Sequence, residues 1–139
     1  MFAEAPLSSG RNRTLAVLLA LPLAACTRTI ELVDLKTGTA LEGAHHVWSR
    51  SMSVVLPTGE TATGTYTKLT TAELGPESLF FGANAGELLG RHAAERVYGY
   101  ARLQGGQGTV VEIIFASDWL GHGYGVARTS TKEEYRVTF

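Results

Sequence analysis

Cysteine is nearly absent from the chain, and so is any concentration of positive charge. Cys26 is the only cysteine, so no intramolecular disulfide can form, and the fold must be stabilised by packing and hydrogen bonding alone. The lysines are scattered singly, at Lys36, Lys68 and Lys132, and the formal net charge is −1. Nucleic-acid-binding domains carry a basic patch or stripe, which this chain lacks. We therefore expect no nucleic-acid partner.

Long hydrophobic runs are equally scarce, and the clearest one lies near the N-terminus. The segment Leu15–Leu23 is uninterrupted but too short for a membrane-spanning helix, which needs about 20 apolar residues. Arg11 and Arg13 precede it, and small residues follow it. A positive region, a short apolar region and small residues at the cleavage point, in this order, are typical of a secretory signal peptide.

The end of this signal is more specific than an ordinary cleavage site. Leu23-Ala24-Ala25-Cys26 resembles the lipobox of bacterial lipoproteins, in which an aliphatic residue and two small residues precede a cysteine. The resemblance covers residues 11–26. It implies a signal peptide over residues 1–25, a diacylglycerol group on Cys26 and a mature domain over residues 26–139. A plain signal peptide, or an apolar helix that happens to precede a cysteine, is the alternative.

The resemblance also implies a location. Two or three acyl chains hold a small protein firmly on a bilayer, so the lipid bilayer itself becomes a partner through acylated Cys26. Thr27 follows the cysteine, where an aspartate would mark retention at the inner membrane. In a Gram-negative source we therefore expect a domain in the cell envelope, facing the periplasm and anchored in the outer membrane.

Glycine is abundant in the mature region, with β-branched and aromatic residues between the glycines, which favours short strands and tight turns. Residues 85–95 are expected to form a short helix, because Asn84 and Glu87 have the spacing of a capping box. The strands are expected at 27–35, 43–48, 51–56, 61–69, 97–104, 109–116, 124–128 and 134–139. Sequential neighbours should pair. The prediction is a single all-β domain, a small antiparallel β-sandwich or partly open barrel.

Histidines are the most suggestive candidates for a site. His45 and His46 are adjacent, and neighbouring residues of a strand point to opposite faces, so the two imidazoles cannot easily share one metal ion. A metal site would need His92 or His122 and a carboxylate to converge with one of them. We expect surface histidines, with no metal and no cofactor.

Two further segments have both a functional and a structural interpretation. The glycine-rich segment Gly121–Gly125 could be a ligand loop, but glycines at alternate positions entering a strand more often permit close packing. The tail, with Tyr135, Val137 and Phe139, resembles the last strand of an outer-membrane barrel. We expect instead that these three side chains face the core, because the strands are short.

The sequence supports function only in outline. No G-x-S-x-G motif is present and aspartates are few, so we expect no catalytic residues and no enzyme. Trp48, Trp119, Tyr98 and Tyr100 could form either a recognition surface or part of the core. The leading hypothesis is a membrane-anchored envelope lipoprotein that serves as a non-enzymatic binding or structural module, with an envelope protein or the cell wall as partner. The alternatives are a periplasmic inhibitor of a cell-wall hydrolase and a small envelope enzyme.

Overall fold

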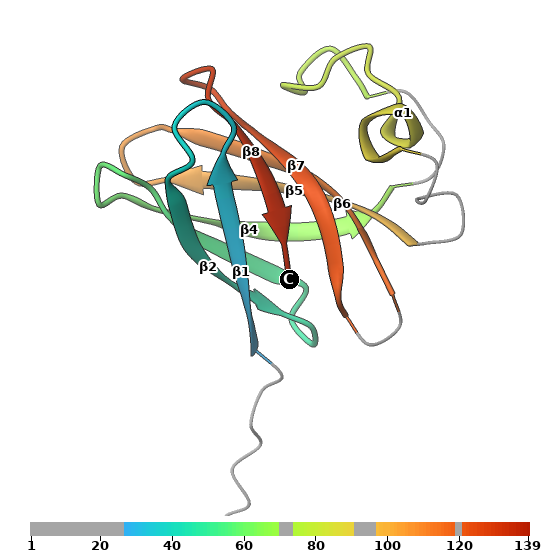
Figure 1. Ribbon diagram of the computed structural model, residues 1–139, viewed down its shortest axis with the longest axis horizontal. Coiled ribbons are helices and arrows are strands. Elements are labelled where there is room, and N and C mark those ends of the chain that lie inside the picture. Colours follow the sequence, from blue (N-terminus) through green and yellow to red (C-terminus); the bar gives the residue numbers. More distant parts are fainter. Residues whose placement is uncertain (1–26, 70–73, 91–96, 119–120) are drawn as a thin grey trace, which may run out of the picture.

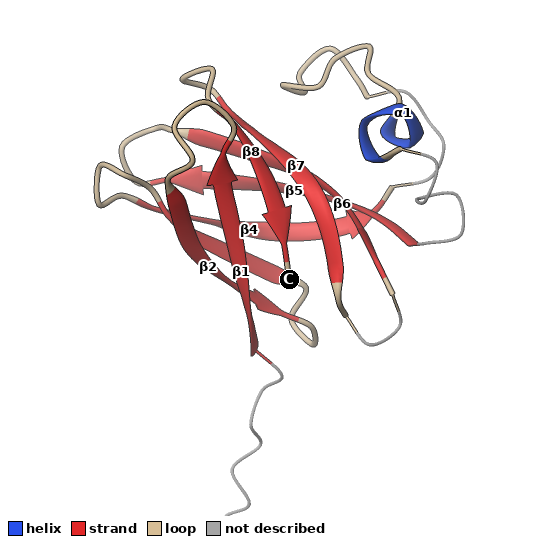
Figure 2. Cartoon of the chain, in the orientation of Figure 1, coloured by secondary structure: helices blue, strands red, loops and turns tan. Residues whose placement is uncertain are grey.

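The fold is a closed barrel of eight antiparallel strands, each paired with its neighbours in the chain (Figures 1 and 2). The computed structural model describes residues 27–69, 74–90, 97–118 and 121–139. The elements are β1 (Thr27–Asp34), β2 (Ala40–His46), β3 (Ser51–Val55), β4 (Thr61–Lys68), α1 (Ala85–Leu89), β5 (Val97–Gly105), β6 (Val110–Ser117), β7 (Gly123–Thr129) and β8 (Glu134–Thr138). Within the described ranges, no helix is long and apolar enough to cross a membrane.

Closure comes from the pairing of the first and last strands. Leu32 of β1 lies opposite Val137 of β8, and both side chains are fully buried. The all-β antiparallel prediction is confirmed, and the closed barrel replaces both the sandwich and the partly open form. Closure removes the exposed edges that a sandwich or an open sheet would leave.

The barrel interior is a packed apolar core. Inward-facing residues alternate with outward-facing ones along each strand, so the buried side chains come from every second position. They are Ile30, Leu32, Leu41, Met52, Val54, Leu56, Ala62, Ala101, Leu103, Val111, Ile113, Phe115, Ala127, Tyr135 and Val137. Phe139 packs against this set, so the expectation that Tyr135, Val137 and Phe139 face the core is confirmed.

A second layer covers one outer wall of the barrel. Residues 74–90, which we call the strap, include α1 and pack against the outward-facing side of β6 and β7, as the position of α1 beside the barrel illustrates (Figure 1). Ile114 and Ala116 of β6 are fully buried beneath Phe80 and Leu89 of the strap. This explains why β6 is apolar on both faces: one face lines the core and the other lies under the strap.

Two elements differ from their predicted bounds by more than one residue. The second strand begins at Ala40 rather than Gly43 and ends at His46 rather than Trp48, because Leu41 pairs with Leu32 and is buried. The predicted helix over 85–95 has its expected cap, since the Asn84 side chain accepts a hydrogen bond of 2.8 Å from the Gly86 N–H. The helix ends at Leu89 because Gly90 adopts a φ of 74°. Residues 91–96 lie outside the described residues.

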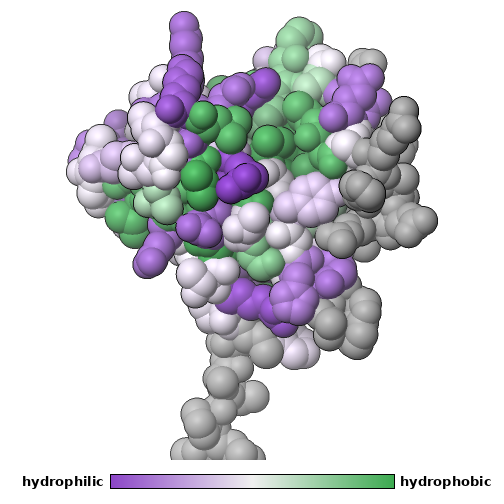
Figure 3. Space-filling view, viewed as in Figure 1, coloured by the Kyte–Doolittle hydropathy of each residue, from purple (hydrophilic) through white to green (hydrophobic). Residues whose placement is uncertain are grey.

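The turns of the barrel fall into two groups, one at each end. The Thr27 end comprises the start of β1, the β2–β3 turn, the β6–β7 turn and the end of β8. The opposite end carries the β1–β2, β3–β4, β5–β6 and β7–β8 turns. On the face shown in Figure 3, hydrophobic surface gathers in the upper part, toward the strap, and the lower part is mainly hydrophilic.

Candidate functional site

A cluster of aromatic rings closes the barrel interior at the Thr27 end. His45, Tyr66, Phe115 and Phe139 come from four different elements and meet edge to face, with ring centroids 5.0 Å apart for His45 and Tyr66 and 5.3 Å apart for Phe115 and Phe139. Edge-to-face packing is the preferred geometry of aromatic pairs. We call these four rings the aromatic layer.

Glycines make room for the aromatic layer. Gly99 of β5, Phe115 of β6 and Gly125 of β7 lie directly opposite one another in the sheet register. A Cβ atom on Gly99 would lie 2.1 Å from Cζ of the Phe115 ring, and one on Gly125 would lie 2.9 Å from Cβ of Phe115. The structural interpretation of the 121–125 segment is thus confirmed, because Gly125 is required for packing.

His45 is the most unusual member of the layer. Its side chain faces inward, the residue is only 4% exposed, and both ring nitrogens are buried without a hydrogen-bond partner among the described residues. Burial lowers the pKa of His45, and the nearby positive charge of Arg28 lowers it further. Both effects favour the neutral form of the His45 imidazole. The expectation that His45 lies at the surface is wrong, because the sheet register turns it inward together with Gly43 and Met52.

The other histidines do not join it. His46 points away from the interior, and its Nδ1 lies 2.9 Å from the Thr27 hydroxyl. His122 is exposed, with Nδ1 3.5 Å from the Asp118 carboxylate. His92 lies outside the described residues. Within the described ranges, no group of three histidine, cysteine, aspartate or glutamate side chains could hold a metal ion.

A cleft of about 230 Å³ lies beside the aromatic layer. Its lining includes the rings of Tyr66 and Phe115, which also pack against His45 of the aromatic layer. The described lining residues are Arg50, Tyr66, Thr67, Lys68, Tyr98, Gly99, Phe115 and Ser117. The cleft therefore combines an aromatic floor, formed by Tyr66 and Phe115, with the two cationic side chains of Arg50 and Lys68.

The charge of the cleft is uncompensated among the described residues. No carboxylate is part of this lining, and neither Arg50 nor Lys68 takes part in an ion pair with another described residue. Burial raises the pKa of the Tyr66 hydroxyl, whereas the charge of Arg50 acts in the opposite direction. A cleft with unpaired cations and a desolvated aromatic floor suits an anion that carries an apolar group.

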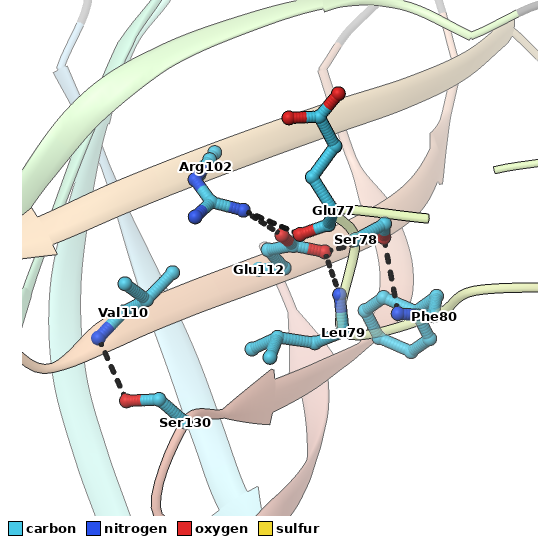
Figure 4. Close-up of polar contacts among 8 residues, drawn as sticks. All are labelled: Glu77, Ser78, Leu79, Phe80, Arg102, Val110, Glu112 and Ser130. Carbon is cyan, nitrogen blue, oxygen red and sulfur yellow. Dashed lines mark hydrogen bonds and ion pairs between the residues drawn. The ribbon is translucent and has the colours of Figure 1, made fainter. Parts of the chain in front are cut away.

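Buried carboxylates elsewhere are already satisfied. Glu112, on the outer face of β6, is fully buried and forms an ion pair with Arg102 of β5. It also accepts hydrogen bonds from the Ser78 hydroxyl at 2.6 Å and from the Leu79 N–H at 2.8 Å, which fasten the strap to the barrel (Figure 4). Because each carboxylate oxygen has a partner, Glu112 is a structural group rather than a free acid.

Arg128 fastens the strap from the next strand. It lies opposite Glu112 in the register, and its Nε donates a hydrogen bond of 2.8 Å to Glu134. Its guanidinium also stacks 4.7 Å above the ring of Phe80. Positive and negative side chains therefore alternate across β5, β6, β7 and β8, in the order Arg102, Glu112, Arg128 and Glu134. The strap packs over this row of charged side chains.

Glu60 has a similar structural role at the opposite end. It is 5% exposed and accepts hydrogen bonds from the Thr109 hydroxyl at 2.8 Å and the Gln107 N–H at 2.6 Å. The Thr109 hydrogen bond, followed by the one from Gln107, holds the pKa of Glu60 below its usual value. Glu60 joins the β3–β4 turn to the β5–β6 turn.

Sequence reasoning found some parts of this site and missed others. Trp48 is 82% exposed, whereas Tyr98 and Tyr100 are partly buried against the strap, so these aromatics form no single surface. Trp119 and Cys26 lie outside the described residues. Arg50, Tyr66, Lys68 and Phe115 went unnoticed as site residues, because only the barrel register brings them together.

Comparison with known proteins adds no family or fold relative. No protein-family model matches the chain, and no significant match is found among curated proteins or solved structures.

Proposed function

We propose that this protein is a lipid-anchored lipoprotein of the bacterial cell envelope that binds a small anionic amphiphile in the cleft at the Thr27 end. The observation that carries the proposal is the cleft itself, where Arg50 and Lys68 border an aromatic floor and no carboxylate contributes to the described lining. Cys26 supplies the anchor, the domain faces the periplasm, and in a Gram-negative source the membrane is the outer one.

The class of ligand follows from the chemistry of the walls. Arg50 and Lys68 would bind a carboxylate or a phosphate, because both side chains only donate hydrogen bonds and carry positive charge. Tyr66 and Phe115 would cover the apolar part. Pockets for drug-sized ligands occupy about 300–1,000 Å³, so a cleft of about 230 Å³ suits a short chain or a single ring rather than a whole lipid.

Binding fits the cleft better than catalysis does. A nucleophile needs a base within hydrogen-bond reach. Ser117 is part of the described lining, but His45, His122 and Asp118 are not. Hydrogen bonds and charges in this arrangement can hold an anion without activating it.

The ligand class is tested by calorimetric titration with octanoate and octyl phosphate, with octanol as the uncharged counterpart. We expect both anions to bind more tightly than octanol. Arg50→Asn should weaken anion binding about two- to tenfold, the range for partly exposed charge pairs and charged hydrogen bonds. Asparagine tolerates the positive φ of 51° at this position, so the change removes charge without straining the backbone.

A matched control comes from the opposite end of the barrel. Lys132 is also a cation in a turn, with a φ of 69°, and Lys132→Asn should leave anion binding unchanged. Equal affinity for octanol and octanoate, or equal losses in the two asparagine variants, would refute the proposed ligand class.

The anchor is tested separately by metabolic labelling. Radiolabelled palmitate should enter the wild-type protein and should not enter Cys26→Ala. Equal labelling of the two proteins, or no labelling of either, would show that Cys26 is not the lipidation site.

A further inference from the structure

We propose that the Thr27 end of the barrel docks against an anionic lipid bilayer, with the Trp48 side chain inserted at the interface. The inference rests on the proposed Cys26 anchor for its orientation, and it goes beyond the anchor by assigning a protein surface to the membrane. Three observations carry it: the position of the β2–β3 turn, the exposure of that turn and the charge around it.

The β2–β3 turn lies next to the point where the described chain begins. Thr27 pairs with His46 at the last position of the β1–β2 ladder, and their side chains lie 2.9 Å apart. Trp48 is two residues farther along the chain, within the turn of residues 47–50, so this turn extends beyond the last β1–β2 pair. Figure 1 shows the start of β1 and the β2–β3 turn at the same end of the barrel. A lipid on Cys26 would therefore lie beside this turn.

Two neighbouring apolar side chains are exposed at this turn. Trp48 is 82% exposed and Val47 is 39% exposed. Tryptophan is enriched at membrane–water interfaces because its ring is apolar and its N–H is polar. Leu35 and Val55 at the opposite end and Phe81 on the strap are exposed too, but Trp48 is the one tryptophan among the exposed apolar residues that the structure describes.

The charge of this end complements an anionic surface. Arg28, Arg50 and Lys68 contribute positive charge, and the side chain of Arg28 reaches the β6–β7 turn at Gly121. Among the described residues of this end, the acidic side chain is Asp118, which lies 3.5 Å from His122. The turns of the opposite end carry Asp34, Glu133 and Glu134 beside Lys36 and Lys132, so attraction to anionic headgroups favours the Thr27 end.

The depth of Trp48 in the membrane tests the inference directly. The chain contains two tryptophans, so Trp119→Phe leaves Trp48 as the only fluorophore of its kind, and Trp48→Phe is the matched partner. The lipidated protein is reconstituted into phosphatidylcholine vesicles with and without about one third phosphatidylglycerol. Quenching by brominated acyl chains reports insertion, and quenching by aqueous acrylamide reports exposure to water.

We expect brominated lipids to quench Trp48 at least twofold more strongly in the anionic vesicles, and acrylamide quenching to fall by a similar factor. Arg28→Gln should weaken both effects. A Trp48 side chain as accessible to acrylamide on vesicles as in detergent-free solution would overturn the inference. If Trp119→Phe does not fold, the quenching of Trp48 is obtained by subtracting the fluorescence of Trp48→Phe from that of the wild type. Trp48→Phe alters only an exposed side chain.

Failure of docking can be told apart from failure of the proposed function. Mass spectrometry of the same samples shows whether Cys26 is acylated, and octanoate titration of Trp48→Phe tests the cleft, to whose described lining Trp48 does not belong. If the protein carries no acyl group, vesicles are added to the soluble chain. Quenching of Trp48 is then still expected at higher lipid concentration, and its absence would overturn the docking surface.

Discussion

The hydroxyl of Ser78 donates a hydrogen bond of 2.6 Å to the carboxylate of Glu112, although the two residues are 34 positions apart in the chain. This contact joins the strap to the outer wall of the barrel, where Glu112 is completely buried. A carboxylate in this position must keep all its hydrogen-bond partners, because an unsatisfied buried charge is costly. Hydrogen bonds from the strap therefore replace some of the hydrogen bonds to water that the Glu112 carboxylate loses on burial.

Removing this hydroxyl should destabilise the whole domain. We expect Ser78→Ala to lower the free energy of unfolding by about 1–3 kcal/mol, the cost of leaving a buried charged acceptor with one partner fewer. Urea denaturation measures the change. Ser130→Ala is the matched control: its hydroxyl accepts an exposed hydrogen bond of 3.0 Å from the Val110 N–H, so its loss should cost less (Figure 4). Equal effects would show that Glu112 does not depend on the strap.

Glu60 should make the free energy of unfolding depend on pH in the acid range. Hydrogen bonds from Thr109 and Gln107 lower its pKa in the folded state, so the unfolded state binds more protons as the pH falls below about 4.5. The stabilisation is complete above that pH and is lost as the pH falls through the folded pKa. Glu60→Gln should flatten the stability profile in this acid range, as measured by urea denaturation at successive pH values. An unchanged profile would exclude this role.

The alternation of apolar and polar residues, together with turn-forming residues, was enough to predict most strands. A half-buried strand has apolar residues at every second position, and in a hairpin it ends at a turn. The expected pairing of the neighbouring strands at 51–56 and 61–69 is confirmed by the pairing of β3 with β4. Closure was not predictable, since it depends on the pairing of β1 with β8, more than 100 residues apart. Local patterns contain no information about which distant edges meet.

The site was harder to predict than the fold for a related reason. His45 and His46 were correctly expected to point to opposite faces, but which face is buried depends on the register with β1 and β3. The cationic cleft joins Arg50 in a turn to Lys68 at the end of β4, two residues with no motif between them. Glu112 lies within the predicted strand at 109–116, and its burial could not be predicted because the strap that covers it comes from a distant segment of the chain.

His45 should make stability depend on pH near neutrality. Burial lowers its folded pKa below the unfolded value of about 6.5, so between these two values the unfolded state binds more protons and stability rises with pH. The neutral ring's contribution is complete above about pH 6.5 and is lost as the pH falls toward the folded pKa. His45→Leu should remove this slope, which urea denaturation between pH 5 and 8 measures.

A control separates the loss of a titrating group from a general loss of stability. Val54→Ala removes buried apolar volume from the same core without removing an ionisable group, so it should lower stability and keep the slope. If Val54→Ala flattened the profile as much as His45→Leu, the slope would not come from His45.

The packing of Gly99 against Phe115 gives the most direct test of the aromatic layer. A Cβ atom on Gly99 would lie 2.1 Å from the ring of Phe115, so Gly99→Ala must displace that ring. Overpacking of this kind costs about 1–3 kcal/mol, measurable as a lower free energy of unfolding. Gly106→Ala is the control, because nothing lies within 4 Å of its added Cβ atom, and it should be nearly neutral.

The second half of this test shows whether the ring itself is the obstacle. Phe115→Leu shortens the side chain, and in its presence the additional cost of Gly99→Ala should shrink, so the two substitutions should be less than additive. Gly99→Ala should also weaken octanoate binding, because Gly99 and Phe115 both line the cleft. If the two changes in the free energy of unfolding were fully additive, the Phe115 ring would not be the reason for a glycine at position 99. Gly99 would then be required for its backbone geometry.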